Sequence, residues 1–353
     1  MKLAERLREK RRQVGLTQAA VATALEVTQP TVTRWEAGVS LPDLEQVAQL
    51  AGLLACSPGW LAFGKQGEDE MNTGPDNTIA FQGFPGAYSH LACRHAFPSM
   101  EVLPCPSFED AFAAVEDGKA RLAMIPIENS LGGRVADIHH LLPRSTLFIN
   151  GEHFEQVEHH LLAPKGAKLE GLKIIRSHPQ GLAQCRELIR GLKVQAEAHS
   201  DTAGAARDVA EAGDRKVGAL ASSLAAEIYG LDILRSRVED KIGNTTRFVI
   251  MARNRKEPDP RSGPCLTSFV FEVRSVPAAL YKALGGFATN GVNIVKLESY
   301  IVDASFTVAQ FYAEIEGHPA DKSVDFAFDE LGYFSNKLKI LGTYPQNPFR
   351  KRG

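Results

Sequence analysis

The sequence has few cysteines, no long apolar run and no secretory signal. Its five cysteines are an odd number and include no CxxC pair, so neither a disulfide framework nor a zinc knuckle is expected. No apolar run reaches the ~18 residues that a membrane-spanning helix needs. The first residues, MKLAERLREK, alternate charges and lack the apolar stretch of a signal peptide. These absences predict a reduced, cytoplasmic protein.

Neither sign of charge dominates, and the common nucleotide-binding motifs are missing. With 40 Lys and Arg against 42 Asp and Glu, the formal net charge is -2, which excludes a uniformly basic nucleic-acid coat but allows a local basic patch. Neither GxGxxG nor a Walker A pattern occurs, so nucleotide binding is not indicated. The chain has 353 residues, and at about 100–200 residues per domain it has room for two or three domains.

Two stretches are too polar and too rich in Pro and Gly to contribute to a core. They read GKQGEDEMNTGPDN and RNRKEPDPRSGP, and they predict linkers. Met71, inside the first stretch, is either an ordinary linker residue or the former start of a shorter protein to which a small module was joined. The predicted divisions are 1–65, a linker at 66–77, 78–253, a linker at 254–264, 265–345 and a tail at 346–353.

The first block has helical periodicity throughout. Thr17 and Thr28 are expected to cap two short helices, and Val32 and Trp35 would face inward from the second. The run LTQAAVATALEVTQPTVTRWEAG resembles the Cro-type helix-turn-helix family, in which the second helix enters the major groove of DNA. The resemblance assigns phosphate contact to Gln18 and groove contact to Gln29, Pro30 and Arg34. Alternatively, the module serves only folding or pairing.

From Thr78 onward, short apolar runs alternate with helix-like segments, which predicts an α/β domain with largely parallel strands. Such sheets bind ligands where strands end and helices begin. The polar turns at these points supply hydroxyls, amides, helix N-termini and one guanidinium, which suits a small carboxylate substrate. The histidine pairs lack the spacing of a metal site, so we predict no metal at His139, His140, His159 or His160.

Seven motifs of this block resemble, in order, those of the prephenate dehydratase family between about residues 79 and 253. They are GFPGAYSH, SFEDAFAAVEDG, PIENSLGG, SHPQGLAQC, DTAGAARDVA, ASSLAAEIYGL and NTTRF. The resemblance implies two α/β lobes like those of a type II periplasmic binding protein, with the substrate in the cleft. On that analogy 79–150 and the strand at Arg247 form one lobe, and 154–234 the other. It also implies a cofactor-free reaction in which prephenate loses water and carbon dioxide to give phenylpyruvate.

The ring hydroxyl of prephenate is a poor leaving group, so a donor must supply a proton as its bond breaks. The resemblance assigns this task to Thr246 and assigns a substrate carboxylate to Arg247. Ser177 is expected to cap the following helix, on which Gln180 and Gln184 share one face. The resemblance names as further catalytic positions Asn129, Ser177 and Gln184, and as substrate-binding positions Gly86, Ser89, Gln180, Thr202 and Phe248. It implies no cofactor and no metal.

Residues 266–343 predict the element order β-α-β-β-α-β of a ferredoxin-like fold. With its GVNIVKLES stretch, this block is similar to the ACT domain of many prephenate dehydratases, which implies feedback binding of L-phenylalanine between paired domains and hence a dimer or tetramer. Ala278 stands where the family has glycine, and Tyr300 with Ile301 replace an arginine and a proline. The implied effector positions are Ala278, Ala279, Leu280, Gly291, Asn293, Glu298 and Ser299.

Two other functions share many of these features. A transcription regulator would need a dehydratase-like domain only to sense a ligand, and such a sensor would have no use for Thr246. An arogenate dehydratase would use the same residues and would recognise an amine in place of a keto group. The sequence favours a multidomain prephenate dehydratase, a carbon–oxygen lyase of L-phenylalanine biosynthesis, with a fused DNA-binding module. It does not separate the two substrates.

Overall fold

A computed structural model describes residues 3–25, 27–54, 61, 74–274, 276–301 and 309–352 of the chain. The contacts divide the chain into two units, Met1–Thr73 and Gly74–Gly353, which are described separately. Met71 lies outside the described residues. No helix in the described ranges is long and apolar enough to cross a bilayer.

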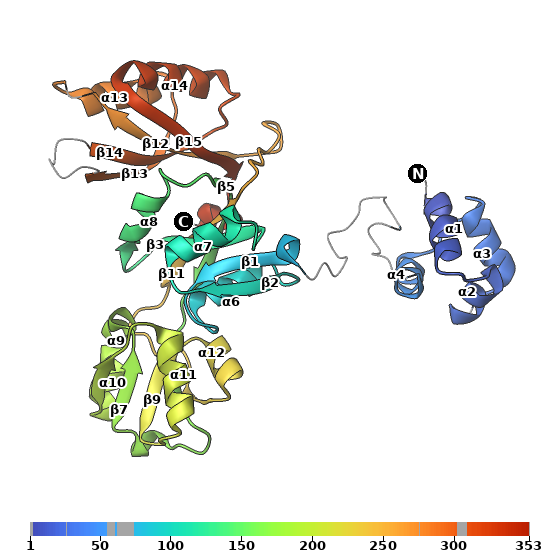
Figure 1. Cartoon of the computed structure of the whole chain (residues 1–353), viewed down its shortest axis with the longest axis horizontal. Coiled ribbons are helices and arrows are strands. Elements are labelled where there is room, and N and C mark those ends of the chain that lie inside the picture. The colour runs from blue at the N-terminus through green and yellow to red at the C-terminus, as the bar shows by residue number, and fades with distance from the viewer. Residues whose placement is uncertain are drawn as a thin grey trace. The chain divides into compact units, whose positions relative to one another are not determined.

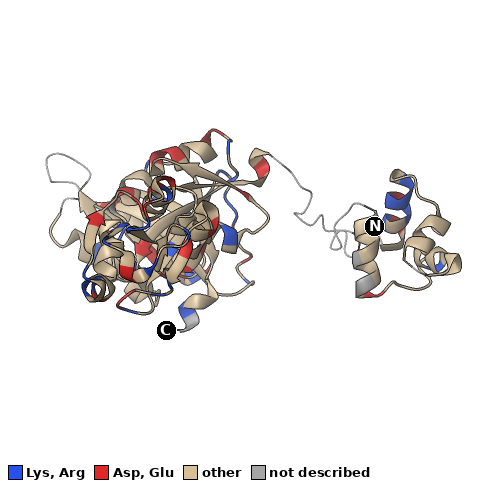
Figure 2. Cartoon of the chain, turned by 90° about the horizontal axis from the view of Figure 1, so that it is seen from below, with Lys and Arg blue, Asp and Glu red and all other residues tan. Residues whose placement is uncertain are grey.

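The N-terminal unit consists of short helices around a small apolar core. Thr17 caps α2 by accepting a hydrogen bond from the backbone N–H of Ala20 at 3.1 Å, whereas Thr28 precedes α3 without a side-chain cap bond. Val32 and Trp35 are buried, as predicted. Lys and Arg gather along α1, next to the N-terminal label in Figure 2. The helices are α1 (Leu3–Gln13), α2 (Gln18–Ala24), α3 (Gln29–Glu36) and α4 (Leu44–Leu53).

The second unit begins with an α/β lobe whose sheet has the order β2-β1-β3-β11-β5, with β4 paired to β3. β1 lies parallel to β2 and β3, but β11 runs antiparallel to both β3 and β5. The prediction of largely parallel strands is therefore wrong for this sheet, which is mixed because β11 returns from the second lobe in the opposite direction. The elements are η1 (Pro75–Asn77), β1 (Thr78–Gln82), α6 (Tyr88–Ala96), β2 (Glu101–Cys105), α7 (Phe108–Glu116), β3 (Leu122–Asn129), β4 (Gly133–Arg134), α8 (Ala136–Leu141), β5 (Phe148–Gln156) and β11 (Thr245–Ala252).

The second lobe is continuous in sequence and has the sheet order β10-β6-β9-β7-β8. The chain enters it after β5 and leaves it before β11, so the predicted division into two lobes is confirmed (Figure 1). Its elements are β6 (His160–Ala163), η2 (Leu169–Gly171), β7 (Ile174–Ser177), α9 (Pro179–Gln184), α10 (Arg186–Leu192), β8 (Gln195–Ala198), α11 (Thr202–Ala212), β9 (Val217–Ala221), α12 (Ser223–Tyr229) and β10 (Asp232–Arg235).

The last block has the predicted β-α-β-β-α-β order, and its antiparallel sheet has the ferredoxin-like order β13-β14-β12-β15. Phe269 and Phe271 of β12 pack beneath α13 and α14, while Leu266 and Val270 join the core of the first lobe. Both faces of β12 are thus buried, which explains why this domain and the first lobe form one unit. The elements are β12 (Cys265–Val273), α13 (Ala279–Thr289), β13 (Ile294–Ile301), β14 (Ala309–Glu316), α14 (Lys322–Phe334), β15 (Ser335–Pro345) and η3 (Pro348–Arg352).

The residues that the sequence leaves as a tail lie against the first lobe. The backbone N–H of Asn347 donates to Glu152 at 3.0 Å. The ring of Phe349 in η3 stacks on Phe154 of β5 with centroids 4.6 Å apart. Figure 1 shows the C-terminal label beside β5 and α7. The C-terminal segment is therefore a third connection between the last domain and the first lobe, in addition to β12 and β15.

A buried histidine lies where α8 meets the C-terminal sheet. His139 is 2 % exposed, and its ring lies 5.5 Å from that of Tyr312 and 6.0 Å from that of Tyr300, between centroids. Neither of its ring nitrogens has a hydrogen-bond partner among the described residues. Burial lowers the pKa of His139 to about 4, so the folded protein holds this side chain neutral.

Acid should therefore weaken the contact at His139. An unfolded chain has a histidine pKa of about 6.5, so between roughly pH 6.5 and 4 only the unfolded state takes up the proton, and the free energy of unfolding falls as pH falls, by up to about 3 kcal/mol. His139→Phe keeps an aromatic ring against Tyr300 and Tyr312 and removes this titration. Urea unfolding at pH 7 and pH 5 should show a smaller loss of stability in the variant. Equal losses in both proteins would contradict the assignment.

Candidate active site

A pocket of about 220 Å³ lies between the two lobes. Residues from both lobes and from the two crossing segments line it. None of these lining residues is Lys or Arg. The lining residues are Gln82, Ala87, Tyr88, Ser89, Asn129, Val135, Val157, His159, His178, Gln180, Gly181, Gln184, Asp201, Thr202, Asn244 and Thr246.

Thr246 and Asn129 form a pair at the base of the pocket. They are direct partners in the β11–β3 ladder, and Asn129 Nδ2 donates to Thr246 Oγ1 at 2.9 Å. An amide nitrogen can only donate, so Thr246 Oγ1 accepts in this bond and its own proton stays available for a ligand. Asn129 Oδ1 in turn accepts from the backbone N–H groups of Leu131 and Gly132 at 3.0 and 2.7 Å. The amide is therefore held at both ends.

A chain of hydrogen bonds leads from this pair to the other lobe. Asn129 Nδ2 also donates to Asn244 Oδ1 at 2.7 Å, and Asn244 Nδ2 donates to Gln184 Oε1 at 3.0 Å. His159 Nε2 lies 2.8 Å from the same Gln184 oxygen, and His159 Nδ1 lies 2.8 Å from the Tyr88 hydroxyl. Five polar side chains beside Thr246 thus fix one another's orientation across the cleft.

Burial favours the neutral form of His159. Burial lowers its pKa, against the opposing effect of its bond with Gln184. Because Gln184 Oε1 can only accept, the ring proton sits on Nε2 and Nδ1 faces the Tyr88 hydroxyl. The sequence prediction of no metal at the histidine pairs missed this role of His159. The sequence signal that could have indicated this role is a histidine directly before a buried strand. The partners of His159 are distant in sequence, so the sequence does not indicate them.

Two helix starts also face the pocket. Tyr88 and Ser89 begin α6, which has no side-chain cap. Asp201 caps α11 by accepting from the backbone N–H of Gly204 at 2.8 Å, and Thr202 follows it in the lining. Free N–H groups in the first turn of a helix favour a carboxylate. They offer neutral donors where the sequence had suggested a guanidinium.

Arg247 does not line the pocket, so its position does not support the expected role in orienting a substrate carboxylate. Successive side chains of a strand point to opposite faces, so Thr246 and Arg247 cannot both face the cleft. The guanidinium of Arg247 is 2 % exposed and binds Glu152 and Glu314 on the far side of the sheet.

Three other expected site residues lie outside the pocket. Ser177 is buried and donates to the carbonyl of Leu220 at 2.7 Å, and His178 caps α9 in its place. Gly86 has φ +90° and allows close packing against the α12 backbone, because a Cβ there would lie 2.8 Å from a Cα of α12. Phe248 belongs to the core between the lobes. These residues shape the cleft without lining it.

Gly132 allows Gln180 of the other lobe to approach closely, since a Cβ at this position would overlap Gln180 Nε2. Gly132→Ala should push the Gln180 amide out of the lining and raise the KM for substrate several-fold, with a smaller effect on kcat. Gln180→Ala should have the same effect. In the Gln180→Ala background, Gly132→Ala should add little. A full further increase in KM there would show that the glycine acts by another route.

The expected effector positions occupy the ends of α13 and β13. Ala278 has φ +57°, and Gly291 has φ +67°, so the family's glycine at the first of these suits the backbone better than alanine does. Ala279 and Leu280 begin α13 and turn toward the core of the C-terminal domain. Asn293 donates to Glu316 at 3.0 Å. Glu298 and the carbonyl of Ser299 accept from Arg134 of the first lobe.

The expected DNA-contacting residues lie on the helix-turn-helix unit. Gln29, Pro30 and Arg34 are exposed on α3. Gln18 Nε2 donates to Glu36 at 2.8 Å, and Gln18 Oε1 accepts from Thr33 at 3.1 Å. Gln18 therefore joins α2 to α3 and fixes the orientation of the second helix.

Known proteins match both units of the chain. The family model described as prephenate dehydratase matches residues 79–256, half of the chain, and one described as helix-turn-helix matches residues 7–61. The chain belongs to the prephenate dehydratase family. Its reaction is the decarboxylative dehydration of prephenate to phenylpyruvate, and a helix-turn-helix module is fused before the catalytic domain.

Curated relatives and solved structures agree with this assignment. A bifunctional N-acyl-homoserine lactone acylase/prephenate dehydratase of Komagataeibacter europaeus is 50 % identical over 277 residues, which are 78 % of this chain and 99 % of that protein. Arogenate dehydratase/prephenate dehydratase 1 of Arabidopsis thaliana is 42 % identical and covered over 73 % of its length, with 77 % of this chain matched. The prephenate dehydratase of Arthrobacter aurescens, solved with L-Phe, superposes with a TM-score of 0.70 at 28 % identity over 76 % of this chain and 90 % of its own.

Proposed function

We propose that Thr246 donates the hydrogen bond, and then the proton, that releases the ring hydroxyl of prephenate. The observation that carries this proposal is the bond from Asn129 to Thr246 Oγ1, which leaves the hydroxyl proton available. As the C–O bond breaks, the ring carboxylate leaves as carbon dioxide, its electron pair completes the aromatic ring, and the hydroxyl departs as water. Because an alcohol is a weak acid, orientation and desolvation contribute most of the rate.

The two carboxylates of the substrate bind to neutral donors. The uncapped first turn of α6 offers N–H groups, and Ser89, Gln180 and Thr202 offer side-chain donors. Hydrogen bonds to charged acceptors are the strong ones, so these donors replace the arginine expected from the sequence. Gln184 and Asn244 keep their bonds to each other and orient the side chains around the ring.

Prephenate and arogenate differ in one group, a keto oxygen in the first and an ammonium in the second. Asp201 is the acidic member of the pocket lining, and it is the group that would hold an ammonium. Because Asp201 Oδ1 already accepts from the backbone N–H of Gly204, we expect the higher kcat/KM with prephenate when turnover is measured with each substrate. Asp201→Asn, which still caps α11, should lower turnover of arogenate more than that of prephenate. A higher kcat/KM with arogenate would make this chain an arogenate dehydratase.

A second candidate activity is the hydrolysis of N-acyl-homoserine lactones, after the Komagataeibacter relative that is named for both reactions. The pocket feature that bears on it is the Tyr88 hydroxyl, which lies 2.8 Å from His159 Nδ1 and also donates to the carbonyl of Glu158 at 2.8 Å. Incubation with an N-acyl-homoserine lactone should release homoserine lactone, and prephenate should inhibit the release. No release by enzyme that turns over prephenate would exclude this activity.

L-Phenylalanine is the effector that the ACT-like domain would bind, and the Arthrobacter relative was solved in complex with L-Phe. Calorimetry on the full chain, with kinetics at saturating phenylalanine, tests this. We expect a coupling of about 5–150-fold on substrate affinity. Ala278→Gly should tighten binding, because it removes a methyl group at a position with positive φ. No heat of binding in either protein would mean that the effector site has been lost.

Paired domains would place a second copy of the chain against α13 and α14. These helices expose Tyr281, Phe326 and Tyr333, and exposed aromatic side chains gathered on neighbouring helices are typical of a protein interface. A dimer would also bring two helix-turn-helix units to successive half-sites on DNA. Analytical ultracentrifugation should show a dimer or tetramer, and Tyr333→Lys should weaken it.

A further inference from the structure

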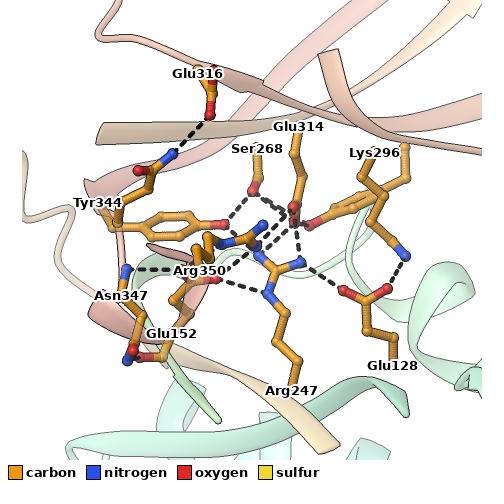
Figure 3. Close-up of polar contacts among 12 residues, drawn as sticks. Glu128, Glu152, Arg247, Ser268, Lys296, Glu314, Glu316, Tyr344, Asn347 and Arg350 are labelled. Atoms are coloured by element: carbon orange, nitrogen blue, oxygen red, sulfur yellow. Dashed lines mark hydrogen bonds and ion pairs between the residues drawn. The ribbon is translucent and has the colours of Figure 1, made fainter. Parts of the chain in front are cut away.

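Arg247 is the centre of a buried cluster of charges behind the active-site strand (Figure 3). Its Nε donates to Glu152 at 2.7 Å. Its two terminal nitrogens donate to Glu314 at 2.8 and 2.9 Å, a bidentate pair. The same nitrogens reach Glu128 at 3.0 Å and the Tyr344 hydroxyl at 3.1 Å. All donor directions of the guanidinium are therefore used.

The cluster joins three parts of the second unit. Glu128 and Glu152 belong to the first lobe, whereas Glu314 lies on β14 of the ACT-like domain. Arg350 of the C-terminal segment donates to Glu152 at 2.8 and 2.9 Å, and Lys296 of β13 contacts Glu128. Three carboxylates thus face three cations across the domain junction. The positive groups keep the pKa of Glu128 and Glu152 low in spite of burial.

Such a cluster is a costly way to attach one domain to another. Desolvating several charges can cancel their mutual attraction, and well-packed apolar residues often hold equally well. The apolar contacts of Leu266 and Val270 already provide attachment. What the charges add is geometry, because a bidentate Arg–carboxylate pair has one favourable arrangement.

The charged cluster and the pair of Thr246 and Asn129 lie on opposite faces of the same two strands, β11 and β3. Thr246 pairs with Asn129 in the β11–β3 ladder, and the next pair along is Arg247 with Glu128. Directly after Arg247 the ladder shifts register at Pro126, which has no N–H to offer. On the β3 side the ladder is interrupted there, whereas the β11–β5 ladder continues past it. The side-chain bonds of Arg247 add a further constraint directly next to Thr246.

We propose that Arg247 is a positioning residue for the dehydratase reaction, which holds Thr246 in place only when Glu314 of the ACT-like domain is docked against it. The proposal rests on the proposed role of Thr246. The docked ACT-like domain would then stabilise the geometry of the active site through Glu314, which lies 67 residues after Arg247 in the chain. The effector stretch lies in the same network, since Lys296 also contacts Glu298, and Arg134 after the Gly132 turn contacts Glu298.

Glu314→Gln tests the proposal in the full chain, because it keeps the shape of the side chain and removes its charge. We expect kcat for prephenate to fall at least tenfold and KM to change less than threefold. A loss of stability alone would lower the amount of folded enzyme but would not change the kcat of the folded enzyme. Thermal unfolding and the content of active protein measure the folded fraction, so that kcat can be corrected for it.

The route through Thr246 is tested in the Thr246→Ala background. If Glu314 acts by positioning that hydroxyl, Glu314→Gln should lower the residual kcat there by less than twofold. An equal loss in both backgrounds would overturn the proposal. The single variant Thr246→Ala separately tests the role of Thr246, so failure of that role and failure of the positioning are distinguishable.

A matched control lies at the same domain junction. Lys339 of β15 donates to the carbonyls of Pro143 and Ser145 in the first lobe but does not contact Arg247. Lys339→Met should leave kcat within twofold. If Glu314→Gln does not fold, Tyr344→Phe is the alternative variant, because it removes only the hydroxyl beside Arg247. It should lower kcat by a smaller factor, and it should leave the residual kcat of the Thr246→Ala enzyme unchanged. An unchanged kcat in folded Glu314→Gln, or in Tyr344→Phe where the first does not fold, would sink the proposal.

Discussion

Thr246→Ala should lower the kcat for prephenate by about 10²–10⁴-fold, the range expected for loss of a general acid. The variant removes one hydroxyl from the pocket and leaves Asn129 its bonds to Asn244 and to the loop that follows β3. We therefore expect little change in thermal stability or in KM. Stopped assays that follow phenylpyruvate give kcat and KM.

Two controls on the same strand sharpen this result. Thr246→Ser keeps the hydroxyl and should recover most of the activity. Thr245→Ala removes a hydroxyl that bonds the carbonyl of Gly243 at 3.3 Å outside the pocket lining, and it should leave kcat within about twofold. A Thr246→Ala enzyme that keeps most of its turnover at normal KM would assign proton donation to another group.

Gln29→Ala combined with Arg34→Ala should remove sequence-specific DNA binding. These side chains are exposed on α3, and each lost base contact costs about 1–3 kcal/mol, so affinity for a selected site should fall at least about 30-fold. Selection from genomic fragments with the intact protein supplies the site, and fluorescence anisotropy compares the variants. Dehydratase activity should not change, because both residues lie in the other unit of the chain.

Gln13→Ala is the matched control, since it removes the same amide from α1, where Gln13 bonds Glu9 at 3.3 Å. It should bind the selected site as the parent does. Low salt strengthens phosphate contacts, so an intact protein that enriches no sequence at low salt would leave the unit as a folding or pairing module. Equal enrichment by the double variant would place the base contacts on other residues.

Much of the site could be predicted from the sequence because its motifs are local. Gln180 and Gln184 line the pocket from one face of α9, as their spacing predicts, and Asp201 caps α11. Asn129 and Thr246, next to the ends of strands, also line the pocket. The side-chain direction of each of these residues is determined by a strand end or a helix face, which are local features of the sequence.

Arg247 shows where sequence reasoning fails. Its motif joins it to Thr246, but the alternation of a strand turns it to the other side of the sheet, and the strand is buried on both sides only because the C-terminal domain covers it. The missed residue His159 is similar, since its partners Tyr88 and Gln184 lie 71 and 25 residues away.

The sequence by itself determined the helix-turn-helix and the order of strands and helices, since these depend on local periodicity, capping and motif spacing. Its resemblance to the prephenate dehydratase family supplied the chemistry of the reaction. Only the tertiary structure decided which side of β11 faces the substrate, and that the C-terminal segment packs back on Glu152. The physical reason is that burial and ion pairing depend on surfaces that distant segments bring together. In this protein Glu152, Arg247, Glu314 and Arg350 meet only after the domains have docked.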